Sequence, residues 1–256
     1  MGAKEMRLIV LGALPRELAS IVNDLGATKS PEGWNFPVYT AKAAPSEILI
    51  AQTGMGMDRA KAALEAVLER FMPDCIVSVG FAGALYANAS AGDLVEGSRL
   101  FKYTLAGTRP SHLSAELNPA LPLPGPFTAR LSGNAHLHEG SIITLEKPME
   151  KKGLSPHVPG GLPFPVCDME TFALGEVAVA RAIPFLAVRS ISDTLEEEVP
   201  PELIGVVDEM GQPKLGRLFH AVTTNPALVT DVIRLKRNSE AASQSLGRFM
   251  KELLSG

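Results

Sequence analysis

Residues 166–193 read VCDMETFALGEVAVARAIPFLAVRSISD, and this stretch indicates the fold class. A helix is predicted from Met169 to about Ala182, and the apolar run Phe185–Ser190 predicts a strand that is buried on both faces. That strand ends in the polar pair Ser192 and Asp193. A helix that leads into a buried strand is the repeating unit of a parallel α/β sheet.

The same alternation of apolar runs and amphipathic segments extends through the rest of the chain. Strands are predicted at Arg7–Ala13, Glu47–Ala51, Cys75–Val79, Asp93–Leu100 and Gly140–Leu145, and helices from Pro15, at Arg59–Phe71 behind an Asp58 cap, and over Leu215–Leu254 with a break near Asn225-Pro226. We therefore expect an α/β fold of three layers, α/β/α, around a central mixed, mostly parallel sheet. Residues 1–256 are predicted to form a single domain.

Composition narrows the classes of function. Hydrophobic residues make up 46% of the chain and charged residues 20%, which is typical of a globular protein. The net charge of −4 shows no excess of basic residues that would bind phosphates, so we predict no nucleic-acid partner. No run of about 18 apolar residues occurs and the N-terminal segment lacks a cleavage site, so no membrane span and a cytoplasmic location are expected. Cys75 and Cys167 stand in apolar runs and are predicted to be buried free thiols.

Residues 103–135 are rich in Pro, Gly, Ser and Asn and are predicted to form a long irregular excursion. Part of it, LNPALPLPGPF at 117–127, is strongly apolar. An apolar segment of this length left in water would promote aggregation. We expect it to be covered at a subunit contact or at the mouth of the site, in a homodimer or a larger homo-oligomer.

The ends of the predicted strands locate a site. Parallel sheets bind ligands at the carboxyl ends of their strands. The segments that follow those ends are Gly12–Glu17, Thr53–Gly56, Gly80–Gly83 and Ser192-Asp193. We therefore expect these four segments to surround one small-molecule site.

Three acidic residues stand beside strand ends or helix starts. Glu17 follows the first strand, Glu170 opens the helix after Val166, and Asp193 follows FLAVRSIS. Carboxylates in such positions can stabilise a developing positive charge or transfer a proton. Each also has a structural interpretation, because a Glu early in a helix complements the helix dipole and an Asp after a strand can cap the next helix.

Nucleotide and metal patterns are weak. The pair Gly54 and Gly56 lacks the third glycine of the dinucleotide fingerprint, since Arg59 stands in its place, and no phosphate-loop GxxxxGK[ST] occurs. His136 and His138 alternate as on one strand face, but neither an HExxH motif nor a cysteine cluster accompanies them. We therefore predict no bound metal and no resident cofactor.

Several stretches together resemble the purine and uridine phosphorylase superfamily, including the methylthioadenosine/S-adenosylhomocysteine nucleosidases. They are LIVLGALPREL, QTGMGMDRAKAAL, PDCIVSVGFAGAL, AGDLV, the 166–193 stretch and RNSEAASQSLGRFMKEL, which span nearly the whole chain in the family's order. The Asp-Met-Glu form at 168–170 and the segment PPELIGVVDEMGQPK look most like phosphorylase-like proteins of bacterial hopanoid biosynthesis. The resemblance implies the nucleoside phosphorylase/nucleosidase fold and cleavage of the N-glycosidic bond of a purine nucleoside, with an adenosine substituted at the 5′ carbon as the expected substrate.

The resemblance also assigns roles. Asp193 would protonate the purine with support from Ser192, Glu170 would bind the ribose hydroxyls beside Met169, and Glu17 would position the attacking water. The other residues implied in substrate binding are Thr53, Gly54, Gly56, Phe81, Ala82 and Gly83, and residues near Glu146–Met149 would line the base pocket. A neighbouring chain would complete the 5′ pocket.

The choice between hydrolysis and phosphorolysis depends on cations. Gly12 and Arg16 match a phosphate site of phosphorolytic relatives, whereas Ser78 stands where a second arginine is found and Phe81 replaces a serine. A phosphate dianion would meet one arginine and would be repelled by Glu17. Hydrolysis is therefore favoured, and phosphate would be a co-substrate only if the enzyme were phosphorolytic.

Two other classes of protein compete with this reading. A non-catalytic nucleoside-binding protein could share the fold, because a fold does not fix a function. The three carboxylates favour an enzyme, since a binding protein needs no general acid. A dinucleotide-dependent oxidoreductase conflicts with the glycine pattern described above.

Overall fold

A computed structural model describes residues 6–43, 46–104, 113–117, 137–197, 199–203 and 205–254. The strands are β1 (Arg7–Gly12), β2 (Thr28–Lys29), β3 (Val38–Ala43), β4 (Ser46–Gln52), β5 (Cys75–Ala84), β6 (Leu94–Tyr103), β7 (Leu113–Leu117), β8 (Leu137–Leu145), β9 (Val166–Asp168) and β10 (Phe185–Asp193). The helices are α1 (Pro15–Asp24), α2 (Met57–Leu68), α4 (Lys151–Leu154), α5 (Thr171–Ala180), α6 (Leu215–Thr224) and α7 (Leu228–Leu254), with 3-10 turns η1 (Ser155–His157) and η2 (Pro201–Leu203).

The strands form one mixed sheet that curls back on itself. At its centre β1 pairs in parallel with β4 and β5, and β5 pairs in parallel with β10. Antiparallel pairing carries the sheet from β10 to β6, and parallel pairing carries it on to β8 and β9. β9 then pairs with the end of β5 at Gly83 and Ala84, which closes a ring of β5, β10, β6, β8 and β9.

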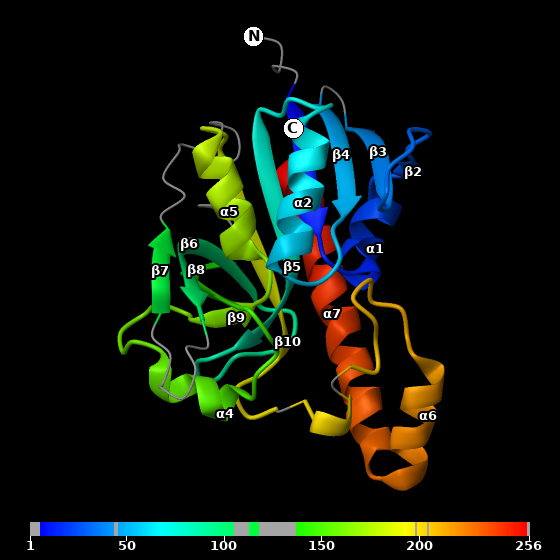
Figure 1. Ribbon diagram of the computed structural model, residues 1–256, viewed down its shortest axis with the longest axis vertical. Helices are drawn as coiled ribbons and strands as arrows, with labels where there is room; N and C mark the ends of the chain where they lie inside the picture. The colour runs from blue at the N-terminus through cyan, green and yellow to red at the C-terminus, as the bar shows by residue number, and fades with distance from the viewer. Residues whose placement is uncertain are drawn as a thin grey trace.

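Helices cover both faces of the sheet (Figure 1). Side chains alternate across β1, so that Ile9 and Leu11 pack with the apolar faces of α2 and α5. Leu8 and Val10 point the other way and pack with α1 and the C-terminal half of α7. This arrangement confirms the predicted three-layer α/β/α fold with a mixed sheet, whose parallel pairs concentrate at its centre.

Three expectations about individual elements need correction. Asp58 is exposed inside the first turn of α2, and Gly56 is the residue before the helix. Gly56 has φ of 99°, a conformation that glycine adopts without strain. The strand predicted to end at Val79 continues through Gly80–Gly83 to Ala84, and β7 lies inside the segment expected to be irregular.

Tyr103 belongs to β6, and residues 105–112 and 118–135 of the predicted excursion lie outside the described residues. The predicted break near Asn225-Pro226 is confirmed, because α6 and α7 are separate helices. Among the described residues, no helix is both long and apolar enough to cross a membrane. That the chain is a single domain stays a prediction.

Candidate active site

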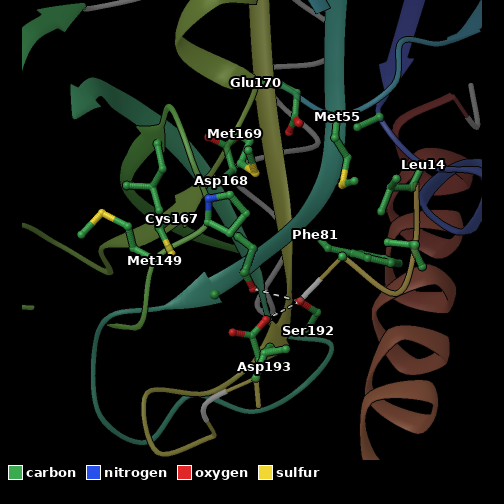
Figure 2. A pocket seen from close by; sticks show the side chains of 18 of the residues that line it. Leu14, Met55, Phe81, Met149, Cys167, Asp168, Met169, Glu170, Ser192 and Asp193 are labelled. Atoms are coloured by element: carbon green, nitrogen blue, oxygen red, sulfur yellow. Dashed lines mark hydrogen bonds between the residues drawn. The ribbon is translucent and has the colours of Figure 1, made fainter. Parts of the chain in front are cut away.

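A cavity of about 580 Å³ opens where β1, β5 and β10 end and where α5 begins. Figure 2 shows the segment from Cys167 to Glu170 along one side, with Phe81 and Leu14 across from it and with Ser192 and Asp193 at the end of β10. The segment between β10 and α6 contributes a further wall, which includes Val199 and Leu203. The cavity thus lies at the carboxyl ends of the central parallel strands, as the sheet topology predicts.

Glu17 is buried on the first turn of α1, with its carboxylate against the main chain. Its Oε1 accepts a hydrogen bond from the Phe81 amide at 2.8 Å, and its Oε2 accepts one from the Leu14 amide at 2.7 Å. Gly80 leaves room for this approach, since a Cβ there would lie 3.0 Å from Oε1. Burial raises the pKa of Glu17, and the amide hydrogen bonds with the positive charge of Arg189 oppose the shift.

Glu170 stands directly before α5 and faces the glycine turn before α2. Its Oε1 accepts a hydrogen bond from the Gly56 amide at 2.7 Å. Burial, together with the negative charges of Asp168 and Glu17, raises the pKa of Glu170 to about 8. Two neighbouring carboxyls therefore retain protons to a higher pH than exposed carboxyls do.

Beneath these two carboxyls lies a buried ion pair. Arg189 Nε donates to Asp168 Oδ2 at 2.9 Å, and both side chains are at most 2% exposed. Ser78 accepts from the same guanidinium through its carbonyl at 3.1 Å and its Oγ at 3.0 Å, and Thr171 Oγ1 accepts from Nη2. Thr144 Oγ1 donates to the other oxygen of Asp168 at 2.7 Å. The pair is therefore fully hydrogen-bonded, and it ties β5, β9, α5 and β10 together.

Asp193 occupies the other side of the cavity and is held by side chains. Ser192 Oγ donates to its Oδ1 at 2.7 Å, and Lys151 Nζ donates to its Oδ2 at 2.6 Å. Lys151 is only 4% exposed and also donates to the carbonyls of Glu197, at 2.7 Å, and Thr194. Gly83 permits this packing, because a Cβ there would lie 2.8 Å from Asp193 Oδ2. Both oxygens of Asp193 thus accept hydrogen bonds, one of them from an ammonium group.

Most of the predicted site residues come together in the structure. The cavity is lined by Glu17, Phe81, Ala82, Gly83, Met169, Glu170, Ser192 and Asp193, and by Pro148 and Met149 from the stretch expected to line the base pocket. That these residues carry the roles implied above stays a prediction.

Five predicted residues lie outside that lining, namely Gly12, Arg16, Thr53, Gly54 and Gly56. Arg16 is exposed, because the turn of α1 that buries Glu17 directs the preceding side chain toward α7, where Nη1 donates to Ser239 Oγ at 3.4 Å. Gly54 is covered, since a Cβ there would lie 2.9 Å from Met210 Sδ. Gly56 contributes indirectly, because its backbone amide donates a hydrogen bond to Glu170.

Two site residues were missed from the sequence. Arg189 carried a signal, because an arginine inside the apolar run FLAVRSIS must be paired if it is buried. No signal in the sequence pointed to Lys151, since its segment EKPMEKKGL is as highly charged as an exposed segment. Only the fold brings Lys151 to a carboxylate 42 residues away.

Cys167 lines the cavity, whereas Cys75 lies outside its lining. Burial raises the pKa of Cys75 and of Cys167 to about 12, so both thiols stay protonated near neutral pH. Both cysteines are free, as predicted, and Cys167 is only partly buried by exposed area. Within the described part of the chain no three His, Cys, Asp or Glu side chains are grouped to bind a metal ion. The ring of His138 stacks on Phe164 at 4.3 Å, and His136 lies outside the described residues.

Comparison with known proteins agrees with this geometry. Residues 7–224 match the family model described as the phosphorylase superfamily. The chain is 22% identical over 219 residues to the 5′-methylthioadenosine/S-adenosylhomocysteine nucleosidase of Shewanella oneidensis, covering 80% of this chain and 92% of that protein. It is 26% identical over 206 residues to the nucleosidase of the same name from Maridesulfovibrio salexigens, covering 75% and 88%.

Solved structures are also similar. The same nucleosidase from Neisseria meningitidis, in complex with methylthio-immucillin-A, has a TM-score of 0.68 at 17% identity, over 97% of this chain and 98% of that one. Futalosine hydrolase of Helicobacter pylori has a TM-score of 0.68 at 16% identity, over 97% of each chain. The predicted resemblance to the superfamily and to its nucleosidases is confirmed, while the resemblance to hopanoid-associated proteins stays a prediction.

Proposed function

We propose that this chain, which belongs to the phosphorylase superfamily, cleaves the N-glycosidic bond of a purine nucleoside by hydrolysis and releases the free base. The relatives named as nucleosidases and as a futalosine hydrolase support this reaction class. The observation that carries the proposal is the environment of Glu17. Its carboxylate takes both amide donors, of Leu14 and of Phe81, at the end of the cavity where an anion would otherwise bind.

Hydrolysis follows from that occupancy. A phosphate ion placed there would lose two amide donors and would meet the negative charge of Glu17. Arg16, the arginine expected to hold phosphate, is exposed and turned toward Ser239. A water molecule needs no such charge compensation, and a buried carboxylate beside it can accept its proton. We therefore assign Glu17 as the residue that orients and deprotonates the attacking water.

The sugar would lie between Met169 and the two buried glutamates. Breaking the bond to the base leaves positive charge on the ribosyl ring, and carboxylates next to it stabilise this charge more than they stabilise a neutral substrate. Glu170 is fixed by the Gly56 amide at 2.7 Å, so one of its oxygens is positioned while the other can bind ribose hydroxyls. Asp168, which also lines the cavity on this side, is paired with Arg189 behind it.

The base would leave on the side of Asp193. A departing purine needs a proton on a ring nitrogen, and Asp193 is assigned as the group that delivers it. Lys151 passes a proton from its ammonium group to the Asp193 carboxylate, and the O–H bond that forms there breaks as the N–H bond of the base forms. Glu17 releases to the solvent the proton that it took from the attacking water, and the Lys151 amine regains one from the solvent, so the protons balance and Lys151 acts on the base only through Asp193.

An apolar 5′ substituent fits the remaining walls. Leu145, Val199, Leu203 and Val207 contribute to the lining at the side formed by the end of β8 and by the segment before α6. Adenosine carrying a large apolar 5′ group is the substrate that such walls favour, in agreement with the hopanoid resemblance. The 5′ group is the part of the substrate on which related enzymes of one reaction class can differ.

Release of free adenine from methylthioadenosine tests the reaction. We expect adenine and methylthioribose to form at the same rate with and without inorganic phosphate. Formation of a ribose 1-phosphate that depends on phosphate would make the enzyme a phosphorylase, and binding without any release of base would make the protein a nucleoside-binding protein. A panel of adenosines with 5′ groups of increasing apolar size would then define the substrate.

A cytoplasmic location and a homodimer or larger homo-oligomer remain part of the proposal. The motivation for the oligomer is the apolar 117–127 segment, most of which lies outside the described residues. Light scattering at micromolar concentration tests it directly. A monomer of about 27.2 kDa would remove the argument that a second chain completes the 5′ pocket.

A further inference from the structure

The hairpin of α6 and the first turns of α7 projects from the body of the molecule (Figure 1). Asn225, Pro226 and Ala227 alone connect the two helices, so they run antiparallel. They pack on each other through a small apolar cluster that includes Leu218, Ala221, Leu228, Val232 and Leu235. In α6 only Ala221 is buried. A ten-residue helix that buries so little is not stable by itself in water.

Large apolar side chains on this hairpin point away from that cluster. Leu215 is 70% exposed, Phe219 73%, Ile233 63% and Val229 43%. Elsewhere in the described chain, only Met72, Val179 and Phe164 are large apolar residues with comparable exposure. Single exposed apolar residues are ordinary, but four on two adjacent helices form a patch.

The four side chains lie on one side of the hairpin. Phe219 directly follows the inward residue Leu218, so it is rotated by roughly 100° from the interface. Val229 and Ile233 directly follow Leu228 and Val232 and are rotated in the same sense. In an antiparallel pair, equal rotations away from the shared interface lead to the same side. Leu215 shares the face of Phe219, because the two are four residues apart.

Basic residues are frequent on the same hairpin. Residues 214–237 contain five basic residues, Lys214, Arg217, Arg234, Lys236 and Arg237, against the single acid Asp231, whereas the whole chain has a net charge of −4. Arg234 is paired with Asp231 at 2.7 Å, and Lys236 lies 3.7 Å from Glu240. Lys214, Arg217 and Arg237 are exposed. The hairpin is therefore basic and apolar in a chain whose net charge is −4.

We infer that this hairpin docks on an anionic lipid membrane surface, with Leu215, Phe219, Val229 and Ile233 inserted at the headgroup boundary. Basic residues beside an exposed apolar stripe are the combination that binds the interface without spanning it. Two copies of the chain packed through the same face would bring their basic residues together, which opposes a dimer there.

The hairpin adjoins the cavity, so docking would bring the cavity to the membrane. This role of the docking rests on the proposed function. Lys214 and Leu203 line the cavity and also adjoin the hairpin. Docking would therefore place the mouth of the cavity close to the bilayer. A nucleoside with a large apolar 5′ group partitions into membranes, so it could enter the cavity from the lipid with little exposure of that group to water.

Co-sedimentation with vesicles tests the inference. We expect the protein to bind vesicles of phosphatidylcholine that contain phosphatidylglycerol, to bind pure phosphatidylcholine at least about tenfold more weakly, and to be released by high salt. The triple variant Leu215→Ser/Phe219→Ser/Ile233→Ser should lower the partition coefficient at least about tenfold. Lys236→Gln/Arg237→Gln should lower it on anionic vesicles alone. The matched control is Met72→Ser, which removes a side chain that is 68% exposed between α2 and β5.

Several outcomes would overturn the inference. They are no binding of the wild type to anionic vesicles at low salt, equal loss of binding in Met72→Ser, or a lipid-free dimer that the triple variant dissociates. The last result would make the patch a contact between copies. Thermal unfolding of the variants shows that the fold is kept, since all the altered side chains are exposed. Vesicle binding by a protein that never releases adenine would refute the proposed function and leave the docking intact.

Discussion

The two sides of the cavity hold their carboxyls by different means. On one side, Glu17 and Glu170 accept hydrogen bonds from main-chain amides of Leu14, Phe81 and Gly56. On the other side, Asp193 accepts hydrogen bonds from the side chains of Ser192 and Lys151. Main-chain donors cannot lose a proton in the reaction, whereas an ammonium group can. The amide side is therefore suited to holding charge in place, and the lysine side to moving a proton.

Of the changes that test this difference between the two sides, replacing Asp193 by Asn should have the largest effect on kcat. The amide cannot deliver a proton to the departing base, so kcat should fall by about a hundred- to ten-thousand-fold. Steady-state release of adenine measures the loss, with Asp58→Asn as a control that changes an exposed carboxylate in α2. Activity within a few-fold of the wild type across a pH series would remove Asp193 from its role.

Glu17→Gln tests the amide side and is expected to lower kcat by about a hundredfold. The variant can no longer accept a proton from water, and added phosphate should not restore activity. One of the two amides, of Leu14 or of Phe81, also loses its acceptor, which should cost about 1–3 kcal/mol of folding free energy. Circular dichroism melting separates this loss of stability from the loss of rate. Recovery of turnover with phosphate would point to phosphorolysis.

Lys151→Met should lower kcat about tenfold, with a smaller change in KM, because the lysine acts on the proton of the departing base and not on substrate binding. A nucleoside methylated at N7 of the purine already carries the charge that protonation supplies. The loss should therefore shrink with that substrate if Lys151 serves the proton. Lys152→Met is the matched control, since the neighbouring side chain is exposed. An equal loss with both substrates would mean that Lys151 only maintains the structure.

The smallest of these effects is that of Glu170→Gln on the pH dependence of stability, which is separate from the loss of rate expected when a carboxylate beside the sugar is removed. The pKa of Glu170 is raised from 4.5 to about 8, so the folded state disfavours its ionised form. Its contribution to stability is therefore complete below pH 4.5 and is lost as the pH rises to about 8. In the variant, the fall in melting temperature across this range should be smaller by at least about 3 °C. An unchanged fall would show that Glu170 ionises like an exposed carboxyl.

The same contrast explains what the sequence could predict. Strand ends and helix starts are local features, so Glu17, Glu170 and Asp193 could be brought together from the alternation of strands and helices alone. Backbone amides are present at any strand end, so hydrogen bonds from amides to Glu17 could largely be expected from the sequence. Lys151 and the wall made by 199–214 depend on a curled sheet and on packing between distant segments. The direction of the Arg16 side chain, toward Ser239, could not be predicted either, because its position on the helix turn decides where it points.

The buried carboxyls on the sugar side of the cavity also determine how many protons are released when a ligand binds. Asp168 is matched by Arg189, whereas burial raises the pKa of both Glu17 and Glu170. A positively charged ligand beside them would favour their ionised forms and so release protons to the solvent on binding. By linkage, such a ligand should bind more tightly as the pH rises toward about 8, while a neutral nucleoside of the same shape should not. The cavity would thus distinguish a cation from its neutral analogue by the protons that it gives up.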